Sequence, residues 1–330
     1  MKVLVTGGAG YIGSVVSTLL LDAGHDVTVV DDLCTGHRDA VPDGARFLQG
    51  RVHDVAASVI TADAGFDAVL HFAAYIAAGE SVGAPEKYWE NNVVGSLRLL
   101  DAVRAARVPR LVFSSTANIY GNPASLPITE TSVAAPPNPY ATSKLAVEYA
   151  LTGDATAHGL AAVTLRYFNA AGALIRPAGS GGSRGERHEP ETHLIPTALR
   201  VAAGRRDKLQ LYGDDYPTPD GTCVRDYIHV TDLATAHLRA LDVVQPGEHR
   251  LYNLGNGAGF SNREVVEAVR EVTGHPVPVE MAPRRAGDPA VLVASSARIR
   301  ADLGWRPDRD LRAMVADAWA FTQSLALPSR

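Results

Sequence analysis

Residues 2–13 read KVLVTGGAGYIG, a short apolar run that leads into a loop with glycines at positions 7, 8, 10 and 13. The apolar run predicts a buried strand. Apolar residues then recur at helical spacing over residues 12–23, and Gly24 follows where a left-handed helix end is expected. Glycines between a strand and a helix permit a tight turn and let backbone N–H groups approach a pyrophosphate. This stretch therefore predicts a dinucleotide-binding strand–turn–helix unit.

Two aspartates end the next predicted strand, which covers residues 26–31. Asp31 is its last residue, and Asp32 follows directly. A carboxylate at this place accepts hydrogen bonds from the adenosine ribose hydroxyls and repels a 2′-phosphate, so NAD is preferred over NADP. For Asp32, a solvated turn residue is an equally good interpretation.

Short apolar runs alternate with helical periods through the first half of the chain. The predicted strands cover residues 2–6, 26–31, 67–73, 110–115 and 160–166. Such alternation is typical of an α/β fold, here a Rossmann-type, doubly wound parallel sheet. We expect an NAD-binding domain over residues 1–170.

The second half is less regular and begins with a Gly/Ser-rich stretch at residues 178–185, which reads as a mobile loop or lid. We expect a smaller α/β substrate-binding domain over residues 171–330, with part of 224–250 returning to pack on the first domain. Residues 261–264 form a capping box that predicts a helix, and Gly274 ends it.

Composition narrows the function classes. The 330 residues carry a formal net charge of −5 and 46% hydrophobic residues, with no run of Lys or Arg that would indicate nucleic-acid binding. Cys34 and Cys223 are the two cysteines, so neither a disulfide framework nor a metal site is expected. No leader or long apolar span appears, and we therefore expect a cytoplasmic, small-molecule enzyme without a membrane partner.

Tyr140 and Lys144 stand four residues apart, hence one turn apart on a predicted helix. An adjacent ammonium and a positive nicotinamide ring would favour the phenolate, which makes Tyr140 a candidate general base. Thr116 ends a predicted strand on the same domain, where open α/β sheets bind ligands. It could bridge a substrate hydroxyl to Tyr140, or simply satisfy its own backbone.

At this point the sequence resembles the extended short-chain dehydrogenase/reductase family over essentially the whole chain. Besides the glycine loop and the Tyr–Lys pair, the similarity rests on HFAA (71–74), GES (79–81), NNV (91–93), LRYFN (165–169), GDDYPT (213–218) and GTCVRDYIHV (221–230). The resemblance implies a bound NAD and inversion of a UDP-sugar at C4. Tyr140 would take and return the 4′-hydroxyl proton, and Lys144 would hold the nicotinamide ribose.

The resemblance also implies which residues contact each ligand. For the cofactor these are Gly7, Gly10, Tyr11, Ile12, Gly13, Asp31, Asp32, Leu33, Cys34, Thr35, Gly36, Arg51, Val52, Phe72, Ala73, Asn91, Tyr140, Lys144 and Phe168. For the substrate they are Thr116, Tyr140, Asn169, His193, Leu194, Gln210, Leu211, Tyr212, Arg225, Arg285, Asp288 and Leu292. The two arginines suit a diphosphate, and the Tyr212 ring suits stacking on uracil.

Several positions depart from the family pattern. Arg51 stands where relatives carry a carboxylate that accepts from the adenine amino group, and an arginine cannot accept. Ile76 replaces a lysine near the cofactor, and His193 replaces an asparagine. Leu292 falls where some relatives carry a tyrosine that limits space beside the sugar, so N-acetylated substrates stay open.

Three functions remain after these comparisons with the family. The first is interconversion of UDP-galactose and UDP-glucose, and the second is the same reaction on a UDP-pentose or UDP-N-acetylhexosamine. The third is a non-catalytic, NAD-sensing protein. A dehydratase is disfavoured because Ala117 and Asn118 stand where such enzymes carry acids. The family also implies a homodimer through helices around 85–106 and 139–157.

Overall fold

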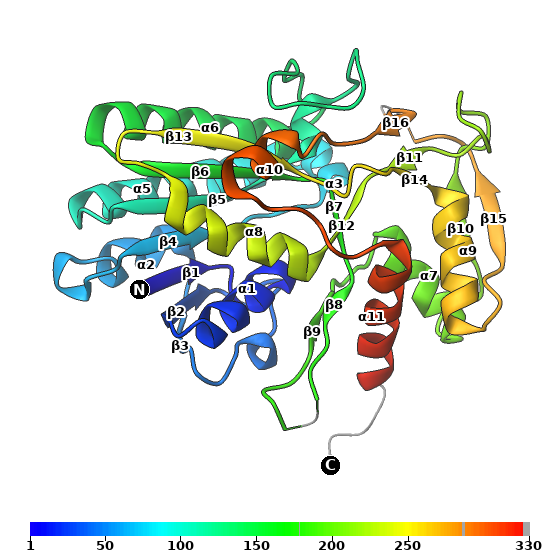
Figure 1. Ribbon diagram of the computed structural model, residues 1–330, viewed down its shortest axis with the longest axis horizontal. Helices are drawn as coiled ribbons and strands as arrows, with labels where there is room; N and C mark the ends of the chain where they lie inside the picture. The colour runs from blue at the N-terminus through cyan, green and yellow to red at the C-terminus, as the bar shows by residue number, and fades with distance from the viewer. Residues whose placement is uncertain (178, 286–287, 326–330) are drawn as a thin grey trace.

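The computed structural model describes residues 1–177, 179–285 and 288–325. Figure 1 shows a large sheet with its helices beside a smaller part that contains α7, α9, α11, β10 and β15. The strands are β1 (Lys2–Thr6), β2 (Asp26–Asp31), β3 (Arg46–Gln49), β4 (Ala68–His71), β5 (Arg110–Thr116), β6 (Ala161–Tyr167), β7 (Asn169–Ala171), β8 (Ala173–Leu174), β9 (Arg184–Gly185), β10 (Leu209–Tyr212), β11 (Val224–Arg225), β12 (Tyr227–His229), β13 (His249–Leu254), β14 (Phe260–Ser261), β15 (Val279–Ala282) and β16 (Val291–Leu292).

The α-helices are α1 (Tyr11–Asp22), α2 (Val52–Val59), α3 (Ala78–Gly83), α4 (Pro85–Tyr88), α5 (Gly95–Ala105), α6 (Pro139–His158), α7 (Leu194–Ala202), α8 (Val230–Val243), α9 (Asn262–Thr273), α10 (Ala297–Leu303) and α11 (Leu311–Ser324). Short 3-10 turns are η1 (Arg38–Ala40), η2 (Ala62–Ala64) and η4 (Ala117–Tyr120), and η3 (Trp89–Val94) is a π-helix.

The large sheet has seven strands in the order β13-β6-β5-β4-β1-β2-β3. All of its pairings are parallel. The strand order reverses between β1 and β4, and ligands bind open α/β sheets at the carboxyl ends of strands beside such a reversal. The predicted doubly wound α/β fold is confirmed. Five of its strands match predicted ones closely, whereas β3 and β13 were not predicted.

Helices cover both faces of this sheet (Figure 1). On one face, Val16 and Leu20 of α1 pack in the same buried cluster as Leu233 of α8. On the other face, side chains of α2, α5 and α6 form a second cluster with strand residues, including Leu99 and Leu151. Burial on both faces explains why these strands read as continuous apolar runs rather than alternating ones.

The smaller part has an apolar core of its own, built by α7, α9 and α11 with β10. The predicted capping box is present: Ser261 accepts from the Glu264 N–H, and the Glu264 side chain accepts from the Ser261 N–H. Gly274 ends α9 in the left-handed conformation, as predicted. The predicted loop at 178–185 includes Ala178, which lies outside the described residues. Its last two residues form β9, which pairs with β8.

The chain returns to the large sheet after its excursion. Helix α8 packs against α1, and β13 pairs with β6 at the sheet's edge, from His249↔Ala162 to Leu254↔Tyr167. This return lies within and just beyond the segment 224–250 that the sequence predicts to come back. The division of the chain at residue 170 stays a prediction.

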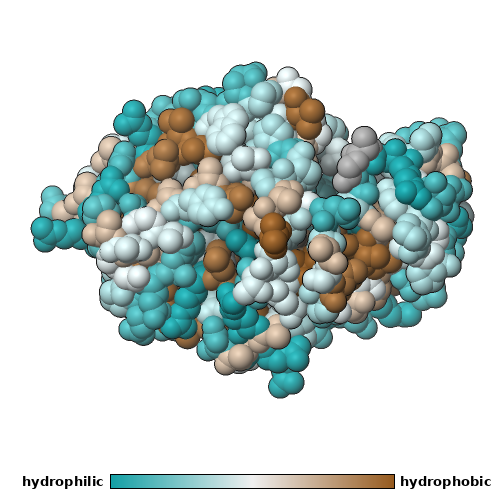
Figure 2. All heavy atoms as spheres, turned by 90° about the horizontal axis from the view of Figure 1, so that it is seen from above, coloured by the Kyte–Doolittle hydropathy of each residue, from teal (hydrophilic) through white to brown (hydrophobic). Residues whose placement is uncertain are grey.

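Within the three described ranges, no helix is both long and apolar enough to cross a bilayer. The face in Figure 2 carries separate apolar patches among polar side chains. Cys34 is exposed and Cys223 buried, and both are free thiols.

A buried ion pair joins α6 to the sheet. Arg166 of β6 donates to both Glu148 oxygens, with an Nη2–Oε2 distance of 2.6 Å, and both side chains are at most 7% exposed. Ser115 of β5 also donates to Glu148, at 2.5 Å. Arg166 further donates to Tyr120, at 2.7 Å, and Tyr120 donates to Asn253 of β13 at 2.7 Å. The network therefore connects α6 with three neighbouring strands.

Replacement of Arg166 by Met should lower the free energy of unfolding by about 3–5 kcal/mol, because it leaves the Glu148 carboxylate buried without its cation. Urea titration followed by circular dichroism measures this difference. Arg104→Met is the matched control: Arg104 pairs with Asp154 at 3.0 Å with its own side chain 39% exposed. It should cost less than about 1 kcal/mol. Equal losses in the two variants would contradict the role assigned to the buried pair.

Candidate active site

The glycine loop packs so tightly that side chains are excluded. Gly7 has φ +73°, and a Cβ there would lie 2.5 Å from the Ala73 backbone nitrogen. A Cβ on Gly13 would lie 2.2 Å from the Gly7 carbonyl oxygen. Helix α1 begins after Gly10 without a side-chain cap, so its first N–H groups keep their capacity to bind an anion. The loop thus has the geometry of a pyrophosphate cradle.

Asp31 braces this loop as well as facing the predicted ribose position. Its Oδ2 accepts from the Ala9 N–H at 2.9 Å, and its Oδ1 accepts from the Leu33 N–H at 2.8 Å. Burial raises the pKa of Asp31 above its usual value, and the two backbone hydrogen bonds oppose that rise. Each carboxylate oxygen can accept more than one hydrogen bond, so capacity remains for ribose hydroxyls.

The other predicted cofactor residues gather around the carboxyl ends of β1, β2 and β4. Leu33 adopts a positive φ of 62°, and a Cβ on Gly36 would lie 2.9 Å from Asp31 Oδ1, so this segment folds closely over Asp31. Arg51, the departure from the family pattern, approaches Asp32 at 3.7 Å. Phe72 donates its N–H to Thr6 O at 2.9 Å, directly beside the glycine loop.

Helix α6 places Tyr140 and Lys144 at its first turns. Asn138 caps the helix by accepting from the Ala141 N–H at 2.9 Å, and Pro139 fills the first helical position. The capping fixes where the helix begins and therefore where Tyr140 points. Lys144 is buried, and its ammonium donates to Ser114 O at 2.8 Å and lies 4.9 Å from the centre of the Phe113 ring.

The pKa of Tyr140 differs from the expectation. We expected Lys144 to favour the phenolate, but burial raises the pKa of Tyr140 above 10, and interaction with the Thr116 hydroxyl opposes this only in part. Burial also lowers the pKa of Lys144 to about 7, with Glu148 acting against that shift. The physical reason is desolvation, which disfavours the charged form of each group. In the protein alone, both side chains are therefore shifted toward their neutral forms.

Thr116 satisfies its own backbone, one of the two roles considered from the sequence, and the bridge to a substrate hydroxyl stays a prediction. Its hydroxyl accepts from the Asn118 N–H at 3.1 Å, which satisfies the local backbone where η4 begins. The same hydroxyl also interacts with the Tyr140 phenol. Thr116 thus lies within reach of the phenol and remains half-buried at the carboxyl end of β5.

Residues outside the predicted set hold Tyr140 in place. The Tyr88 ring meets the Tyr140 ring edge-on, with centroids 6.4 Å apart. Tyr88 in turn donates to Ala77 O at 2.7 Å and Glu80 Oε2 at 2.8 Å. Asn92 donates to the Ser143 hydroxyl at 3.0 Å. The family motifs at 79–81 and 91–93 signalled these positions in the sequence, but not their contact with α6.

In the smaller part of the molecule, predicted substrate residues lie together in two groups. Arg225 of β11 pairs in register with Leu292 of β16 and lies 3.9 Å from Asp288. The Arg285 guanidinium lies 3.9 Å from the centre of the Tyr212 ring, and Tyr212 donates to Gln210 at 3.1 Å. A diphosphate and a planar base are ligands that such groups suit.

The remaining predicted substrate residues differ from one another in burial and in their contacts. Asn169 donates its side-chain N–H to Asp226 O at 3.1 Å. Leu211 is 3% exposed in the apolar core of the smaller part, so its backbone rather than its side chain is available to a ligand. His193 immediately precedes α7 and Leu194 begins it. Beside it, Glu186 holds the pKa of His193 well above its usual range.

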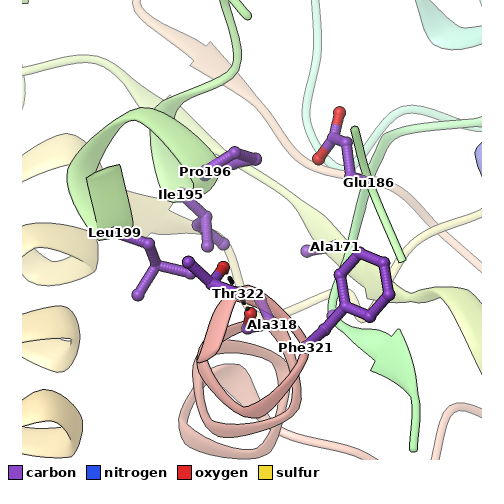
Figure 3. Close-up of a pocket in the computed structure, with 9 residues that line it drawn as sticks. Ala171, Glu186, Ile195, Pro196, Leu199, Ala318, Phe321 and Thr322 are labelled. Atoms are coloured by element: carbon purple, nitrogen blue, oxygen red, sulfur yellow. Dashed lines mark hydrogen bonds between the residues drawn. The ribbon is translucent and has the colours of Figure 1, made fainter. Parts of the chain in front are cut away.

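A small, open hollow lies elsewhere, between α7 and α11. Ile195, Pro196 and Leu199 line it from α7, and Ala318, Phe321 and Thr322 line it from α11 (Figure 3). Neither Tyr140 nor Lys144 lines this hollow. The candidate active site is therefore identified from the positions of its side chains and not from this hollow.

The comparisons with known proteins agree with this geometry. The model of the NAD dependent epimerase/dehydratase family matches residues 3–255. The chain belongs to this family. A UDP-glucose 4-epimerase of Corynebacterium glutamicum is 56% identical to this family member over 326 residues, which are 98% of this chain and 97% of that protein. One from Streptomyces lividans is 57% identical over 327 residues, 98% of this chain and 96% of that protein.

A solved structure resembles this family member throughout. It is the UDP-glucose-4-epimerase from Stenotrophomonas maltophila with bound NAD and formylated UDP-arabinopyranose. It superposes with a TM-score of 0.91 at 40% identity and covers 99% of each chain. The resemblance to the extended short-chain dehydrogenase/reductase family is confirmed by these findings.

The lowered pKa of Lys144 predicts how the stability of the protein changes with pH. A lysine in the unfolded chain has a pKa near 10.4. Between about pH 7 and pH 10.4, Lys144 therefore binds a proton in the unfolded chain but not in the folded protein. Over this range its contribution to the free energy of unfolding rises with pH. Lys144→Met lacks the group. Its stability relative to the wild-type protein should therefore be most favourable below pH 7 and decline as pH rises toward 10.

Thermal unfolding of both proteins from pH 6 to pH 10 measures this difference. Lys208→Met, at a side chain 55% exposed, controls for the loss of a lysine and should show no such trend. A pH-independent difference for Lys144→Met would refute the depressed pKa.

Proposed function

We propose that this chain interconverts UDP-galactose and UDP-glucose, with NAD as a cofactor that is regenerated in each turnover. The observation that carries the proposal is the placement of Tyr140 and Lys144, one helical turn apart, at the carboxyl edge of a sheet whose glycine loop leaves no room for a side chain at Gly7 or Gly13. Relatives that share 56–57% of its residues over nearly the full length are UDP-glucose 4-epimerases.

The residues fit an NAD molecule along its length. Gly7, Gly10 and Gly13 leave backbone N–H groups and space for the pyrophosphate. Asp31 faces the adenosine ribose, and Arg51 beside Asp32 could stack on the adenine where relatives offer a carboxylate. The remaining contacts fall to Tyr11, Ile12, Leu33, Cys34, Thr35, Gly36, Val52, Phe72, Ala73, Asn91 and the Phe168 backbone.

Bound NAD would supply a nicotinamide ring that can accept a hydride from C4 of the sugar and return it to the opposite face of the resulting 4-keto sugar. The Tyr140 phenolate oxygen takes the proton of the 4′-hydroxyl and gives it back after the sugar has turned. In this mechanism the Thr116 hydroxyl, which interacts with the Tyr140 phenol, bridges the phenol to the sugar hydroxyl. Lys144 holds the nicotinamide ribose and, when charged, stabilises the phenolate.

The UDP group binds across the smaller part in this proposal. Arg225 and Arg285 neutralise the diphosphate, and the Tyr212 ring stacks on the uracil. Asp288, 3.9 Å from Arg225, helps to orient that guanidinium. Asn169, His193, Leu194, Gln210 and Leu211 complete the contacts, the last through its backbone.

Two rival functions remain. A UDP-pentose or UDP-N-acetylhexosamine 4-epimerase would need no other catalytic group, and a UDP-pentose derivative is bound in the Stenotrophomonas maltophila structure. A non-catalytic NAD sensor would not need Tyr140 and Lys144. A dehydratase is disfavoured by Ala117, which is buried, and Asn118, since neither carries an acid for elimination of water.

We also propose that the chain works as a cytoplasmic homodimer with domains at 1–170 and 171–330. Apolar side chains are exposed on the helices that the family uses for pairing. Trp89, Val94 and Leu97 are 36–43% exposed, and Tyr149 of α6 is 69% exposed. Such a patch supports association with a second copy.

Tyr140→Phe should reduce the turnover of UDP-galactose by at least about 100- to 10,000-fold, because it removes the group that transfers the proton. NAD should remain bound, since the glycine loop and Asp31 are unchanged. Coupled detection of UDP-glucose and an enzymatic assay of the NAD released on denaturation measure the two properties separately.

Tyr149→Phe is the matched control, because it changes the same residue type on the same helix at an exposed position. It should retain turnover. Full activity of Tyr140→Phe would sink the mechanism. A wild-type protein that holds NAD but never equilibrates the two sugars would favour the sensor.

Leu292 offers a test of substrate preference, since it is half-buried beside Arg225. Leu292→Tyr should lower kcat/KM for UDP-N-acetylgalactosamine more than for UDP-galactose or UDP-arabinose, because the ring takes space that the acetyl group needs. Leu292→Met serves as the volume-conserving control. Uniform losses on all three substrates would rule out a role for this position in selecting the sugar.

A further inference from the structure

Four side chains between β9 and α7 converge, and one of them, His193, is also a predicted substrate residue. They are Glu186, His188, Glu191 and His193, and one ligand atom from each lies within 4.8 Å of every other. Glu186 Oε1 lies 3.0 Å from His188 Nδ1 and 2.8 Å from His193 Nδ1. Glu191 Oε1 lies 2.9 Å from His193 Nδ1. Two carboxylates and two imidazoles thus share one small volume.

The carboxylates of this cluster are buried. The Glu186 side chain is 8% exposed and the Glu191 side chain 1%. Among the described residues, the two pair only with His188 and His193, since Arg187 binds Asp39 and Arg200 binds Glu189. Burying two anions is costly without nearby positive charge. The two buried carboxylates therefore require positive charge close to them.

Hydrogen bonding leaves the cluster incomplete. Glu191 Oε2 is buried and has no hydrogen-bond partner within the described part of the chain. His193 Nδ1 faces a carboxylate oxygen on two sides, at 2.8 Å and 2.9 Å, although a ring nitrogen carries at most one proton. A buried oxygen without a donor and a nitrogen with two acceptors are both explained by a cation among them.

We propose that Glu186, His188, Glu191 and His193 bind a divalent transition-metal ion, with Zn²⁺ as the best match. Metal–ligand bonds of about 2.0–2.2 Å place neighbouring ligand atoms roughly 3–3.5 Å apart. Here the ligand atoms are 2.8 Å apart at the closest and no more than 4.8 Å apart at the farthest. Imidazole nitrogens with carboxylate oxygens suit zinc, whereas magnesium and calcium prefer oxygen ligands alone. Metal binding would also give Glu191 Oε2 its missing partner.

The site is placed to stiffen the segment that enters α7. Arg187, between the ligands, donates to both Asp39 oxygens, and its carbonyl oxygen lies 2.9 Å from His37 Nε2, so the segment is also held to the larger part. In Figure 3 the Glu186 carboxylate points away from Phe321 and Thr322, although Glu186 also borders the hollow between α7 and α11. Coordination through Nδ1 would leave Nε2 of His193 free for a diphosphate.

Zn²⁺ binding by the full-length protein tests this inference without substrate or turnover. After treatment with EDTA, we expect the chain to take up about one equivalent of Zn²⁺, measured by competition with a chromophoric chelator, and to unfold at a higher temperature with Zn²⁺ present. His188→Gln should weaken binding by more than about 100-fold, since loss of even an outer-shell partner costs about 10- to 100-fold.

The controls separate this site from adventitious binding. His158→Gln removes a histidine 48% exposed at the end of α6 and should leave Zn²⁺ affinity unchanged. Glu191→Gln provides a second variant, and circular dichroism verifies that each one folds. Cobalt substitution should give visible absorption bands that His188→Gln loses. Absence of Zn²⁺ uptake, or equal affinity in the wild-type protein and His188→Gln, would overturn the proposal. Neither result bears on the epimerase reaction, which is tested through Tyr140.

Discussion

The buried contact between Glu148 and Arg166 constrains the catalytic helix more than any other interaction described. Tyr140, Lys144 and Glu148 are spaced by four residues, so they share one face of α6, and that face is turned toward the carboxyl edge of the sheet. Both carboxylate oxygens of Glu148 accept hydrogen bonds from Arg166 of β6, and Ser115 of β5 also donates to Glu148. A helix anchored at this point cannot rotate or slide without breaking a charged pair in a place from which water is excluded.

Burial of the same helix face explains the electrostatic state of the active site. Lys144 lies between the anchored carboxylate and Tyr140, buried against Phe113, and desolvation brings its pKa to about 7. A lysine with such a pKa responds strongly to any new charge in its vicinity. The phenol of Tyr140 is subject to the same desolvation. The protein therefore supplies the geometry of a base, and the occupants of the site decide how far that base is ionised.

Local patterns made the first part of the fold predictable, and long-range packing made the rest unpredictable. The strand at 2–6 and the helix capped before Gly24 follow from apolar periodicity and glycine placement alone. β3, with the sequence RFLQ, is too short and polar to stand out, and only its pairing with β2 makes it a strand. The direction in which the pKa of Tyr140 shifts depends on burial, which the spacing of residues in the sequence does not reveal. The ligand set at 186–193 escaped because cysteines, rather than the repeated Glu-x-His spacing, were taken as the mark of a metal.

The edge position of β13 has a consequence for how the molecule is made. Its partner β6 ends at Tyr167, but β13 ends only at Leu254, with β7–β12, α7 and α8 between them. On a ribosome that adds about 5–20 residues per second, β6 would wait roughly 4–17 s as an unpaired edge before its neighbour emerges. An open edge strand is a template for pairing with other chains. The nascent protein thus passes through an interval in which its largest sheet is unfinished, and chaperone protection would matter most there.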